Sequence, residues 1–313
     1  MTSGQPRVRP RALRRGDRIA LLTLASRSRP EDVEAAADEL RSLGFEPVVR
    51  PAVDGGVAYV AGAAAARAAQ LRAALTDPQI AAVIATRGGY GSAQLLPYLN
   101  LDEVRDTRTL LVGYSDLTAL LDVWTGMAGL VTVHGPMAEG RLARGAAGYD
   151  RDSFVRLVSE PVAFGPIPTG PAQTLQAGEA RGELRGGTLT QLVALLGTPW
   201  AHTNRGDTVL FIDEVNERQY RLDRWLWQLR QAGVFRHVRG VVLNELPGCD
   251  EPGGCIAALD AVREALDGVS GPIVAGLASG HTSGAMISLP FGVQVTLRAG
   301  ADVALSIDEP AVE

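Results

Sequence analysis

The chain has 313 residues, a formal net charge of −5 at neutral pH and an apolar fraction of 46%. These values predict a folded globular protein of about two domains and exclude a disordered chain. The sequence contains no lysine, which excludes a Schiff-base lysine, a Walker A loop and a Ser–Lys dyad. It also lacks a basic tract interleaved with aromatic residues, so we expect no nucleic-acid partner.

The N-terminal segment resembles a secretion signal only at first sight. Residues 7–18 are basic and residues 19–25 are apolar, but the apolar run is short and directly follows two charged residues. We expect a first β-strand there. Since no stretch of about 18 apolar residues occurs, the sequence predicts no membrane contact and a cytoplasmic protein. Cys249 and Cys255 fit neither a disulfide framework nor a zinc motif, and we expect free thiols.

The first half of the chain alternates between strand-like and helix-like patterns. Strands are predicted over residues 19–25, 48–50, 80–85, 109–113 and 130–133. Helices are predicted over residues 30–44, over residues 61–75 and from Asp116 to about Gly126. Such alternation predicts a parallel sheet with helices on both faces.

Residues 141–178 interrupt this alternation with a cluster of prolines and glycines. We interpret them as a linker between an N-terminal domain, residues 1–140, and a C-terminal domain, residues 179–313. In the second domain, strands are predicted over residues 208–212, 240–243 and 272–277. Helices are predicted over residues 188–196 and 218–233 and between the last two strands. The tail, residues 286–307, has the alternation of a β-meander.

Ser115 is the first candidate for chemistry. It directly follows a predicted strand and precedes a helix, so its hydroxyl would lie at the carboxyl edge of the sheet. The N–H groups of the helix N-terminus could hold an oxyanion there. Serine is equally typical of a simple helix N-cap, and the turn lacks the GxSxG pattern. Position alone therefore leaves both interpretations open.

A glycine-rich segment, Arg87-Gly88-Gly89-Tyr90-Gly91, follows the strand over residues 80–85. Closely spaced glycines let backbone N–H groups approach a ligand. The segment matches neither a dinucleotide-binding fingerprint nor a phosphate-binding loop. It could complete an oxyanion hole, or it could be only a tight turn between strand and helix.

The remaining candidates lie in the second half. His281 follows the strand over residues 272–277 among small residues, where it could be a general base or a solvated loop residue. His134 is interpreted as a structural hydrogen-bonding residue. Asp213 and Glu214 follow another strand, and a carboxylate there could orient a histidine. Because strand side chains alternate between faces, only one of these two can face a given site.

Six segments occur together in one order along nearly the whole chain. They are Arg87-Gly88-Gly89-Tyr90-Gly91, Gly113-Tyr114-Ser115-Asp116, His134-Gly135-Pro136, Gly186-Gly187-Thr188-Leu189-Thr190, Val215-Asn216-Glu217 with Tyr220-Arg221-Leu222-Asp223-Arg224, and Ser279-Gly280-His281. In these segments the chain resembles the LD-carboxypeptidase family of serine peptidases. The resemblance implies a flavodoxin-like N-terminal domain, a C-terminal β/α domain, an active site between them and a homodimer.

The resemblance also implies a Ser–Glu–His triad, with Ser115 as the nucleophile and His281 as the base. Backbone N–H groups of Gly89 and Asp116 would form the oxyanion hole. The family usually reads Glu-Asp-Val-x-Glu after the strand, whereas here the order is Asp213-Glu214-Val215-Asn216-Glu217. The register puts Asp213 in the position of the acid, and strand alternation favours it. A local bulge would turn Glu214 inward instead.

The function implied by the resemblance is that of an L,D-carboxypeptidase that removes the terminal D-alanine from cytoplasmic murein tetrapeptide in peptidoglycan recycling. Two alternatives stay open. One is a microcin-immunity peptidase that cleaves peptidyl or aminoacyl nucleotide amides. The other is a catalytically inactive binding protein with the same fold, because the order of Asp213 and Glu214 is inverted. No cofactor is expected, and no metal, because no two histidines have ligand spacing.

Overall fold

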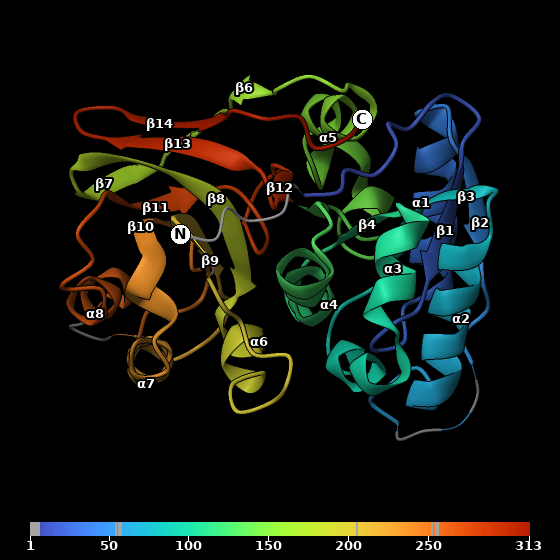
Figure 1. The fold of residues 1–313 in the computed structure, drawn as a ribbon, viewed down its shortest axis with the longest axis horizontal. Helices are drawn as coiled ribbons and strands as arrows, with labels where there is room; N and C mark the ends of the chain where they lie inside the picture. Colours follow the sequence, from blue (N-terminus) through green and yellow to red (C-terminus); the bar gives the residue numbers. More distant parts are fainter. Residues whose placement is uncertain (1–6, 54, 56–57, 205, 252, 254–256) are drawn as a thin grey trace.

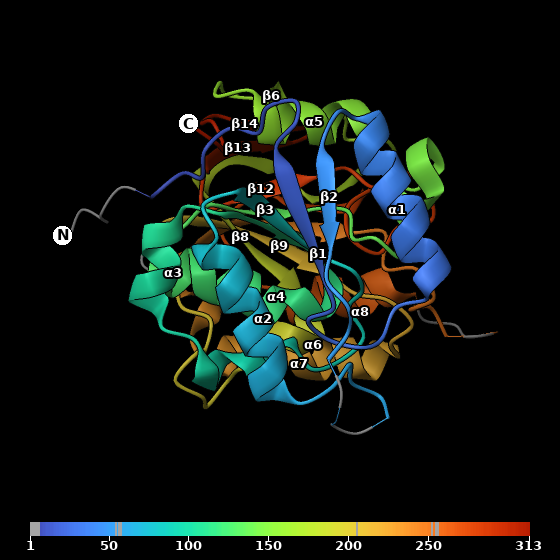
Figure 2. The same ribbon diagram turned by 90° about the vertical axis from the view of Figure 1, so that its right-hand side faces the viewer.

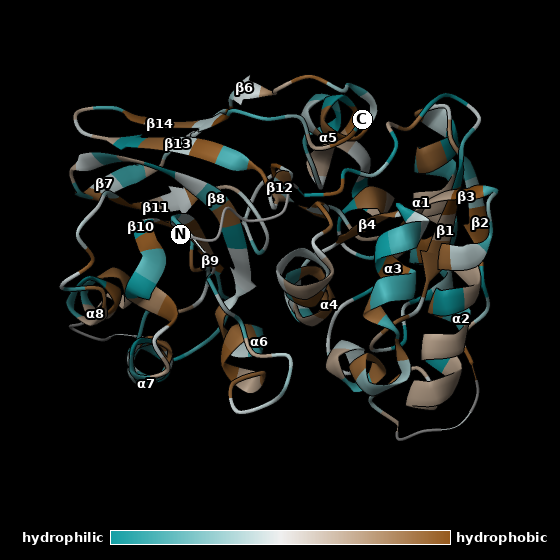
Figure 3. Cartoon of the chain, in the orientation of Figure 1, coloured by the Kyte–Doolittle hydropathy of each residue, from teal (hydrophilic) through white to brown (hydrophobic). Residues whose placement is uncertain are grey.

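Two β-sheets form the framework of the protein and lie side by side (Figure 1). The computed structural model describes residues 7–53, 55, 58–204, 206–251, 253 and 257–313. Figure 3 shows that apolar residues concentrate in the strands of the first sheet, whereas the outer helices alternate between apolar and polar residues. The predicted mixture of strands and helices in both halves of the chain is confirmed.

The first sheet has the strand order β12-β5-β4-β3-β1-β2. Its strands are β1 (Arg18–Leu22), β2 (Glu46–Val49), β3 (Ile80–Ala85), β4 (Leu110–Gly113), β5 (Thr132–His134) and β12 (Leu289–Phe291). The strands β1 to β5 are parallel, and their order 2-1-3-4-5 is that of a flavodoxin-like sheet. Nearly continuous apolar runs such as β3 are buried on both faces, as parallel strands are.

Helices cover both faces of this sheet, as predicted. Figure 2 shows α1 on one side of β1 and β2, and α2 and α3 on the other. The helices are α1 (Pro30–Ser42), α2 (Ala64–Thr76), α3 (Leu101–Thr107) and α4 (Thr118–Val123), with short 3₁₀ helices at Ser92–Tyr98 and Ser115–Leu117 and a π-helical turn at Trp124–Ala128. Every residue of α4 is buried. A helix buried on all sides lies between two layers, and in Figure 1 α4 lies between the two sheets.

The segment predicted as a linker contains regular structure. Residues 141–178 hold a 3₁₀ helix (Leu142–Ala147), α5 (Arg151–Ser159), β6 (Gly165–Pro166) and β7 (Gln173–Gln176). The strands β6 and β7 form the two edges of the second sheet. The domain boundaries at residues 140 and 178 stay predictions.

The second sheet has the order β6-β14-β13-β8-β9-β10-β11-β7. Its remaining strands are β8 (Gly178–Thr188), β9 (Thr208–Asp213), β10 (Val238–Asn244), β11 (Ile273–Leu277), β13 (Gln294–Ala299) and β14 (Val303–Ile307). The strands β8 to β11 are parallel, and the others are antiparallel to their neighbours. The helices that pack on this sheet are α6 (Leu189–Ala194), α7 (Gln219–Gln231) and α8 (Ala258–Ala265).

The tail is not the single β-meander that its pattern predicted. The strands β13 and β14 do form an antiparallel hairpin. In contrast, β12 pairs with β5 of the first sheet, with Leu289 opposite His134. Alternating residues predict a strand but not its partner, and β5 would otherwise be an open edge. The segment around residue 12 also contacts the C-terminus, because the backbone N–H of Ala12 donates to the carbonyl of Glu313 at 2.8 Å.

The main apolar core continues from one sheet to the other. It includes Leu111 and Val112 of β4 together with Val209 and Phe211 of β9 and Phe291 of β12. A smaller core lies under α6, α7 and α8. The continuous core holds the carboxyl ends of β4 and β9 in a fixed relationship, and these ends carry the predicted site residues.

Candidate active site

Ser115 lies directly beyond β4, at the start of the 3₁₀ helix that leads into α4. Its backbone has a φ of +60°, a left-handed conformation that residues other than glycine rarely adopt. Strain of this kind occurs where a fold presents a functional side chain on a sharp turn between strand and helix. The side chain stays partly exposed. Ser115 therefore lies at the carboxyl edge of the first sheet, between a strand and a helix, as its position in the sequence predicted.

The glycine-rich segment packs directly against this turn. A methyl group on Gly88 would lie 3.0 Å from Cβ and 3.1 Å from Oγ of Ser115, and 3.4 Å from the backbone nitrogen of Asp116. The next residue, Gly89, has no hydrogen-bond acceptor for its N–H within the described part of the chain. Asp116 is the second residue of a 3₁₀ helix, where N–H groups lack partners inside the helix. Both predicted oxyanion donors thus belong to backbone that meets at Ser115.

Asp213 and His281 form a close pair at the ends of β9 and β11. Oδ2 of Asp213 lies 2.8 Å from Nδ1 of His281, and Oδ1 accepts the backbone N–H of the same histidine at 2.9 Å. Gly280 makes this approach possible, because its φ is +69° and a methyl group there would lie 2.6 Å from Cγ of Asp213. Asp213 is fully buried, and 19% of the His281 side chain is exposed.

Two further donors complete the shell of Asp213. The hydroxyl of Thr188 donates to Oδ2 at 2.9 Å, and the amide of Asn244 donates to Oδ1 at 2.6 Å. Each carboxylate oxygen therefore accepts two hydrogen bonds, so this buried group is fully partnered. The same amide of Asn244 donates to the backbone carbonyl of His281 at 2.6 Å.

The electrostatics of the pair follow from this geometry. Burial alone would raise the pKa of Asp213, but the charge and hydrogen bonds of His281 outweigh burial and lower it below its usual value. Burial would likewise lower the pKa of His281, but the Asp213 carboxylate outweighs it, and the pKa of His281 is raised. The aspartate is therefore ionised at neutral pH and stabilises a proton on the imidazole.

Glu214 points away from this pair. Its Oε2 accepts the backbone N–H and the hydroxyl of Thr190, and its Oε1 accepts the backbone N–H of Val215. Burial raises the pKa of Glu214 above its usual value. Of the two carboxylates that the sequence left open, the structure brings Asp213 and not Glu214 to His281.

His281 lies against the element that carries Ser115. Its ring centroid is 5.2 Å from that of Tyr114, the residue before Ser115, and the two rings meet edge to face. The described residues include no hydrogen bond between Ser115 and His281. In substrate-free enzymes such bonds are often long and tighten when substrate binds. His281, at the end of a second-sheet strand, therefore lies beside Tyr114, the residue that precedes Ser115 at the end of a first-sheet strand.

The loop of His281 is fastened by two residues that the sequence did not single out. Arg141 is buried and donates to the carbonyls of Gly280, at 2.8 Å, and of Thr282, at 3.1 Å. Glu245 accepts the backbone N–H of Ser283 at 2.9 Å. No local pattern distinguishes these two from other charged residues, because their roles depend on chain segments far apart in sequence.

A buried ionic cluster also went unrecognised in the sequence. Oδ1 of Asp122, on α4, lies 2.7 Å from Nη2 of Arg185, on β8, and 2.7 Å from Nδ1 of His202. Burial opposes ionisation of Asp122, but His202 and Arg185 outweigh it and hold its pKa well below the usual range. The cluster connects α4, the helix that follows Ser115, to β8, the strand that ends at Thr188.

The prediction for His134 was wrong. Among the described residues neither of its ring nitrogens has a hydrogen-bond partner. Instead, the ring lies among the aromatic rings of Tyr114, Phe211 and Phe291, with centroid distances of 5.0 to 6.0 Å. Burial lowers its pKa to about 4, so it packs there as a neutral ring.

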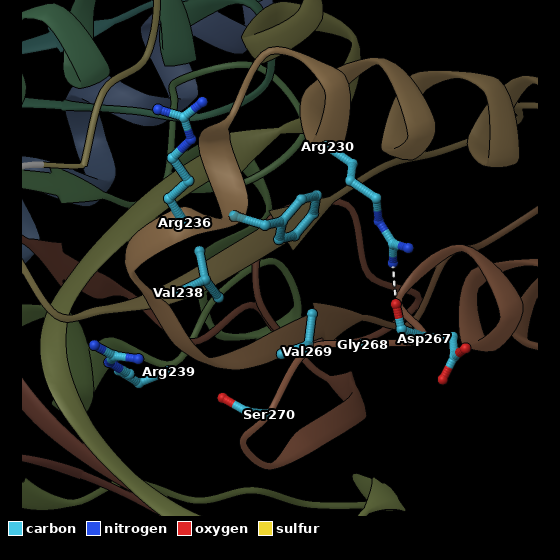
Figure 4. Close-up of a pocket in the computed structure, with 9 residues that line it drawn as sticks. Arg230, Arg236, Val238, Arg239, Asp267, Gly268, Val269 and Ser270 are labelled. Carbon is cyan, nitrogen blue, oxygen red and sulfur yellow. Dashed lines mark hydrogen bonds between the residues drawn. The ribbon is translucent and has the colours of Figure 1, made fainter.

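A hollow of about 280 Å³ lies at the opposite edge of the second sheet, where β10 and β11 begin (Figure 4). Arg230, Arg236 and Arg239 line it. Figure 4 shows Arg236 and Arg239 pointing away from Arg230, which donates to the backbone carbonyl of Asp267. The three guanidinium groups do not converge, and the hollow is separate from the pair of Asp213 and His281.

Within the described residues, no cluster of three or more His, Cys, Asp or Glu side chains could hold a metal ion. In the same part of the chain, none of the helices combines the length and apolar character needed to cross a bilayer.

Models of known families identify the chain. The models for the N-terminal and the C-terminal domains of LD-carboxypeptidases match residues 19–135 and 181–297. The putative carboxypeptidase SCO6489 of Streptomyces coelicolor is 36% identical over 313 residues, which cover 97% of each chain. The chain belongs to the LD-carboxypeptidase family. This confirms the family and the serine-type carboxypeptidase class expected from the six segments, and the two α/β sheets agree with the expected fold class.

Other LD-carboxypeptidases extend the comparison. The murein tetrapeptide carboxypeptidase of Pseudomonas aeruginosa is 30% identical over 271 residues, which cover 84% of this chain and 88% of that protein. The crystal structure of muramoyltetrapeptide carboxypeptidase from Oxalobacter formigenes has a TM-score of 0.82 at 26% identity and covers 93% of this chain and 99% of that chain.

A second kind of relative shares the fold. An active-site mutant of the microcin C7 self-immunity protein MccF, with a serine, an asparagine and a lysine replaced by alanine, has a TM-score of 0.87. It is 22% identical to this chain and covers 98% of it and 100% of its own length. At this identity the likeness concerns the fold alone.

Proposed function

We propose that this LD-carboxypeptidase is a serine enzyme that removes the terminal D-alanine from murein tetrapeptide. Ser115 is the nucleophile, His281 the general base and Asp213 the acid that orients the histidine. The substrate class follows the names of the relatives from Pseudomonas aeruginosa and Oxalobacter formigenes. Such a peptide arises when the cell wall is broken down and recycled, and we place the enzyme in the cytoplasm as a homodimer.

The observation that carries this proposal is the double contact between Asp213 and His281. The Nδ1 atom of the histidine is engaged by the carboxylate at 2.8 Å, which leaves Nε2 to face a nucleophile. A carboxylate that is ionised and buried in this way fixes the tautomer and the direction of the imidazole. A solvated loop histidine has no reason to carry such a partner.

In the proposed reaction, Oγ of Ser115 attacks the carbonyl carbon of the L,D-amide while Nε2 of His281 takes its proton. The tetrahedral intermediate collapses, and the imidazolium returns that proton to the leaving amine of D-alanine. A water molecule, deprotonated by the same histidine, then hydrolyses the acyl-enzyme. General base catalysis of this kind contributes about 10²–10⁴-fold.

The oxyanion of both intermediates would be held by the backbone N–H groups of Gly89 and Asp116. Support comes from the contact of Gly88 with both Ser115 and Asp116, which brings the two backbone segments together. Each such donor typically contributes about 10²–10³-fold to the rate.

Incubation of the purified protein with murein tetrapeptide should release D-alanine, and Ser115→Ala should abolish the release. A fluorophosphonate probe should label the wild-type protein and leave Ser115→Ala unlabelled. Undiminished release by Ser115→Ala would contradict the serine mechanism. Gel filtration of the same samples tests the homodimer.

The microcin-immunity alternative has only a likeness of fold to MccF behind it. One feature of the sequence speaks against it. The MccF active-site mutant replaces a lysine, whereas this chain contains none. We therefore rank the nucleotide amide below the murein peptide. Turnover of a peptidyl sulfamoyl adenosine faster than turnover of tetrapeptide would reverse this order.

An inactive binding protein is the remaining alternative, and it was motivated by the inverted order of Asp213 and Glu214. The full set of donors around Asp213 speaks against a degraded site, since a buried carboxylate without function would cost stability. Absence of fluorophosphonate labelling together with retained tetrapeptide binding would favour this alternative.

A further inference from the structure

Thr188 joins the two halves of the proposed site. It is the last residue of β8, it is buried, and it lies opposite Asp213 in the parallel register of β8 and β9. Its hydroxyl donates at 2.9 Å to Oδ2 of Asp213. The same oxygen accepts Nδ1–H of His281 at 2.8 Å. Thr188 and His281 therefore share one carboxylate oxygen.

The backbone of Thr188 contacts the other half. Its N–H donates at 3.0 Å to Oγ1 of Thr118. Thr118 is fully buried and is the first residue of α4, three residues beyond Ser115. A short series of bonded groups thus leads from the helix of the nucleophile to the acid and on to the base.

We propose that Thr188 is a positioning residue of this active site: its hydroxyl fixes the Asp213 carboxylate toward His281, and its backbone N–H fixes the helix that follows Ser115. The inference rests on the proposed roles of Ser115, Asp213 and His281.

The physical argument concerns the single oxygen Oδ2. Two donors fix the rotation of a carboxylate better than one, and each donor withdraws negative charge from the oxygen that it contacts. Without the Thr188 hydroxyl, Oδ2 would hold the proton of a charged His281 more tightly, so the pKa of His281 would rise further. Oδ1 would keep its two donors, the amide of Asn244 and the backbone of His281.

Removal of the Thr188 hydroxyl changes none of the other charged or titratable groups that surround His281. They are the carboxylate of Glu214 on β9, the guanidinium of Arg141, the ring of His134 on β5 and the ring of Tyr114. A change in the titration of His281 on removal of the Thr188 hydroxyl is therefore attributable to Asp213.

The chain provides a matched control two residues away. The hydroxyl of Thr190 donates to Oε2 of Glu214, the neighbouring carboxylate that does not contact His281. Thr188→Val and Thr190→Val each remove one threonine hydroxyl from the same segment. The first variant takes a hydrogen-bond donor from Asp213, and the second takes one from Glu214. Only the first of these carboxylates engages the proposed base.

The experiment compares Thr188→Val, Thr188→Ser and Thr190→Val with the wild-type protein. The pH dependence of the fluorophosphonate labelling rate measures how well His281 activates Ser115. NMR titration of the histidine rings measures the pKa of His281 directly and needs no reaction. We expect Thr188→Val to be labelled about 10- to 100-fold more slowly at neutral pH, as for loss of a hydrogen bond to a charged group. In Thr188→Val, the acid limb of the labelling rate and the midpoint of the His281 titration should both move to higher pH. Thr188→Ser should restore both, and Thr190→Val should match the wild type.

An unchanged labelling profile and an unchanged His281 titration in Thr188→Val would overturn the inference, as would equal effects of Thr188→Val and Thr190→Val. If Thr188→Val does not fold, Thr188→Ala removes the same donor and is read in the same way. If labelling occurs but tetrapeptide is not cleaved, only the proposed substrate fails. If the wild type is not labelled, the serine mechanism fails, and the NMR titration still decides whether Thr188 controls His281.

Discussion

Asp213 holds His281 by two bonds at once, one to the ring nitrogen Nδ1 and one to the backbone N–H. The acid therefore fixes both the rotation of the imidazole and the position of the loop that carries it. Loss of this carboxylate should affect activity far more than loss of its neighbour.

We expect Asp213→Asn to lower kcat by about 10³–10⁴-fold, because an amide favours the wrong tautomer of the histidine. Glu214→Gln is the matched control, since Glu214 contacts Thr190 and Val215 instead. Release of D-alanine by the two variants measures the difference. Equal losses would show that Asp213 has no special role.

Lengthening the acid should also impair the enzyme, although the family usually carries glutamate at this position. Asp213 is fully buried, it accepts four hydrogen bonds, and its Cγ lies 2.6 Å from the place of a methyl group on Gly280. An added methylene would displace the His281 loop, and overpacking of a buried position costs about 1–3 kcal/mol. We expect Asp213→Glu to lower both kcat and thermal stability. Wild-type activity would indicate that the loop adapts freely.

Activity should rise with pH through the pKa of His281. The base acts in its neutral form, and Asp213 raises the pKa of His281 above 6.5 despite burial. The acid limb of kcat/KM should therefore lie above pH 6.5. The contribution of His281 to folding stability changes with pH in the opposite direction. Because its pKa is higher in the folded than in the unfolded protein, this contribution is fully present below the unfolded-state pKa. It is lost as the pH rises through the folded-state pKa. A pH–rate profile and thermal melts over pH 5–9 test both signs.

Gly88→Ala should inactivate the enzyme without unfolding it. The added methyl group would lie 3.0 Å from Cβ and 3.1 Å from Oγ of Ser115, closer than ordinary packing allows. We expect slower fluorophosphonate labelling and a nearly unchanged melting temperature. Gly206→Ala is the control, because a methyl group there would meet no atom within 4 Å. Labelling of Gly88→Ala at the wild-type rate would show that the turn at Ser115 accommodates the added methyl group.

Arg185→Met should destabilise the protein by about 3–5 kcal/mol, because it leaves the buried Asp122 carboxylate with one partner fewer. The exposed pair of Arg72 and Glu103 is the control, and Arg72→Met should have little effect on stability.

The Asp122 cluster should also make stability depend on pH. Since the folded-state pKa of Asp122 lies below its usual value of 3.8, the contribution of Asp122 to stability is present above about pH 4 and is lost as pH falls further. Urea denaturation at pH 7 and pH 3 measures both effects.

The sequence predicted those parts of the protein that depend on local pattern. The strand over residues 80–85 has the predicted bounds, Ser115 and His281 lie beyond the predicted strands, and strand alternation favoured the carboxylate that contacts His281. Features that depend on distant partners were missed. Nothing near Arg141 indicates four backbone carbonyls as its partners. Nothing near His202 indicates Asp122, which lies 80 residues away.

The crossing of β12 into the first sheet has a consequence for how the molecule unfolds. The chain passes from the first sheet to the second and then returns to add an edge strand beside β5. A fragment that ended before residue 289 would leave that edge unprotected and remove Phe291 from the shared core. We therefore expect the two lobes to melt in one cooperative transition, and neither half to survive limited proteolysis on its own.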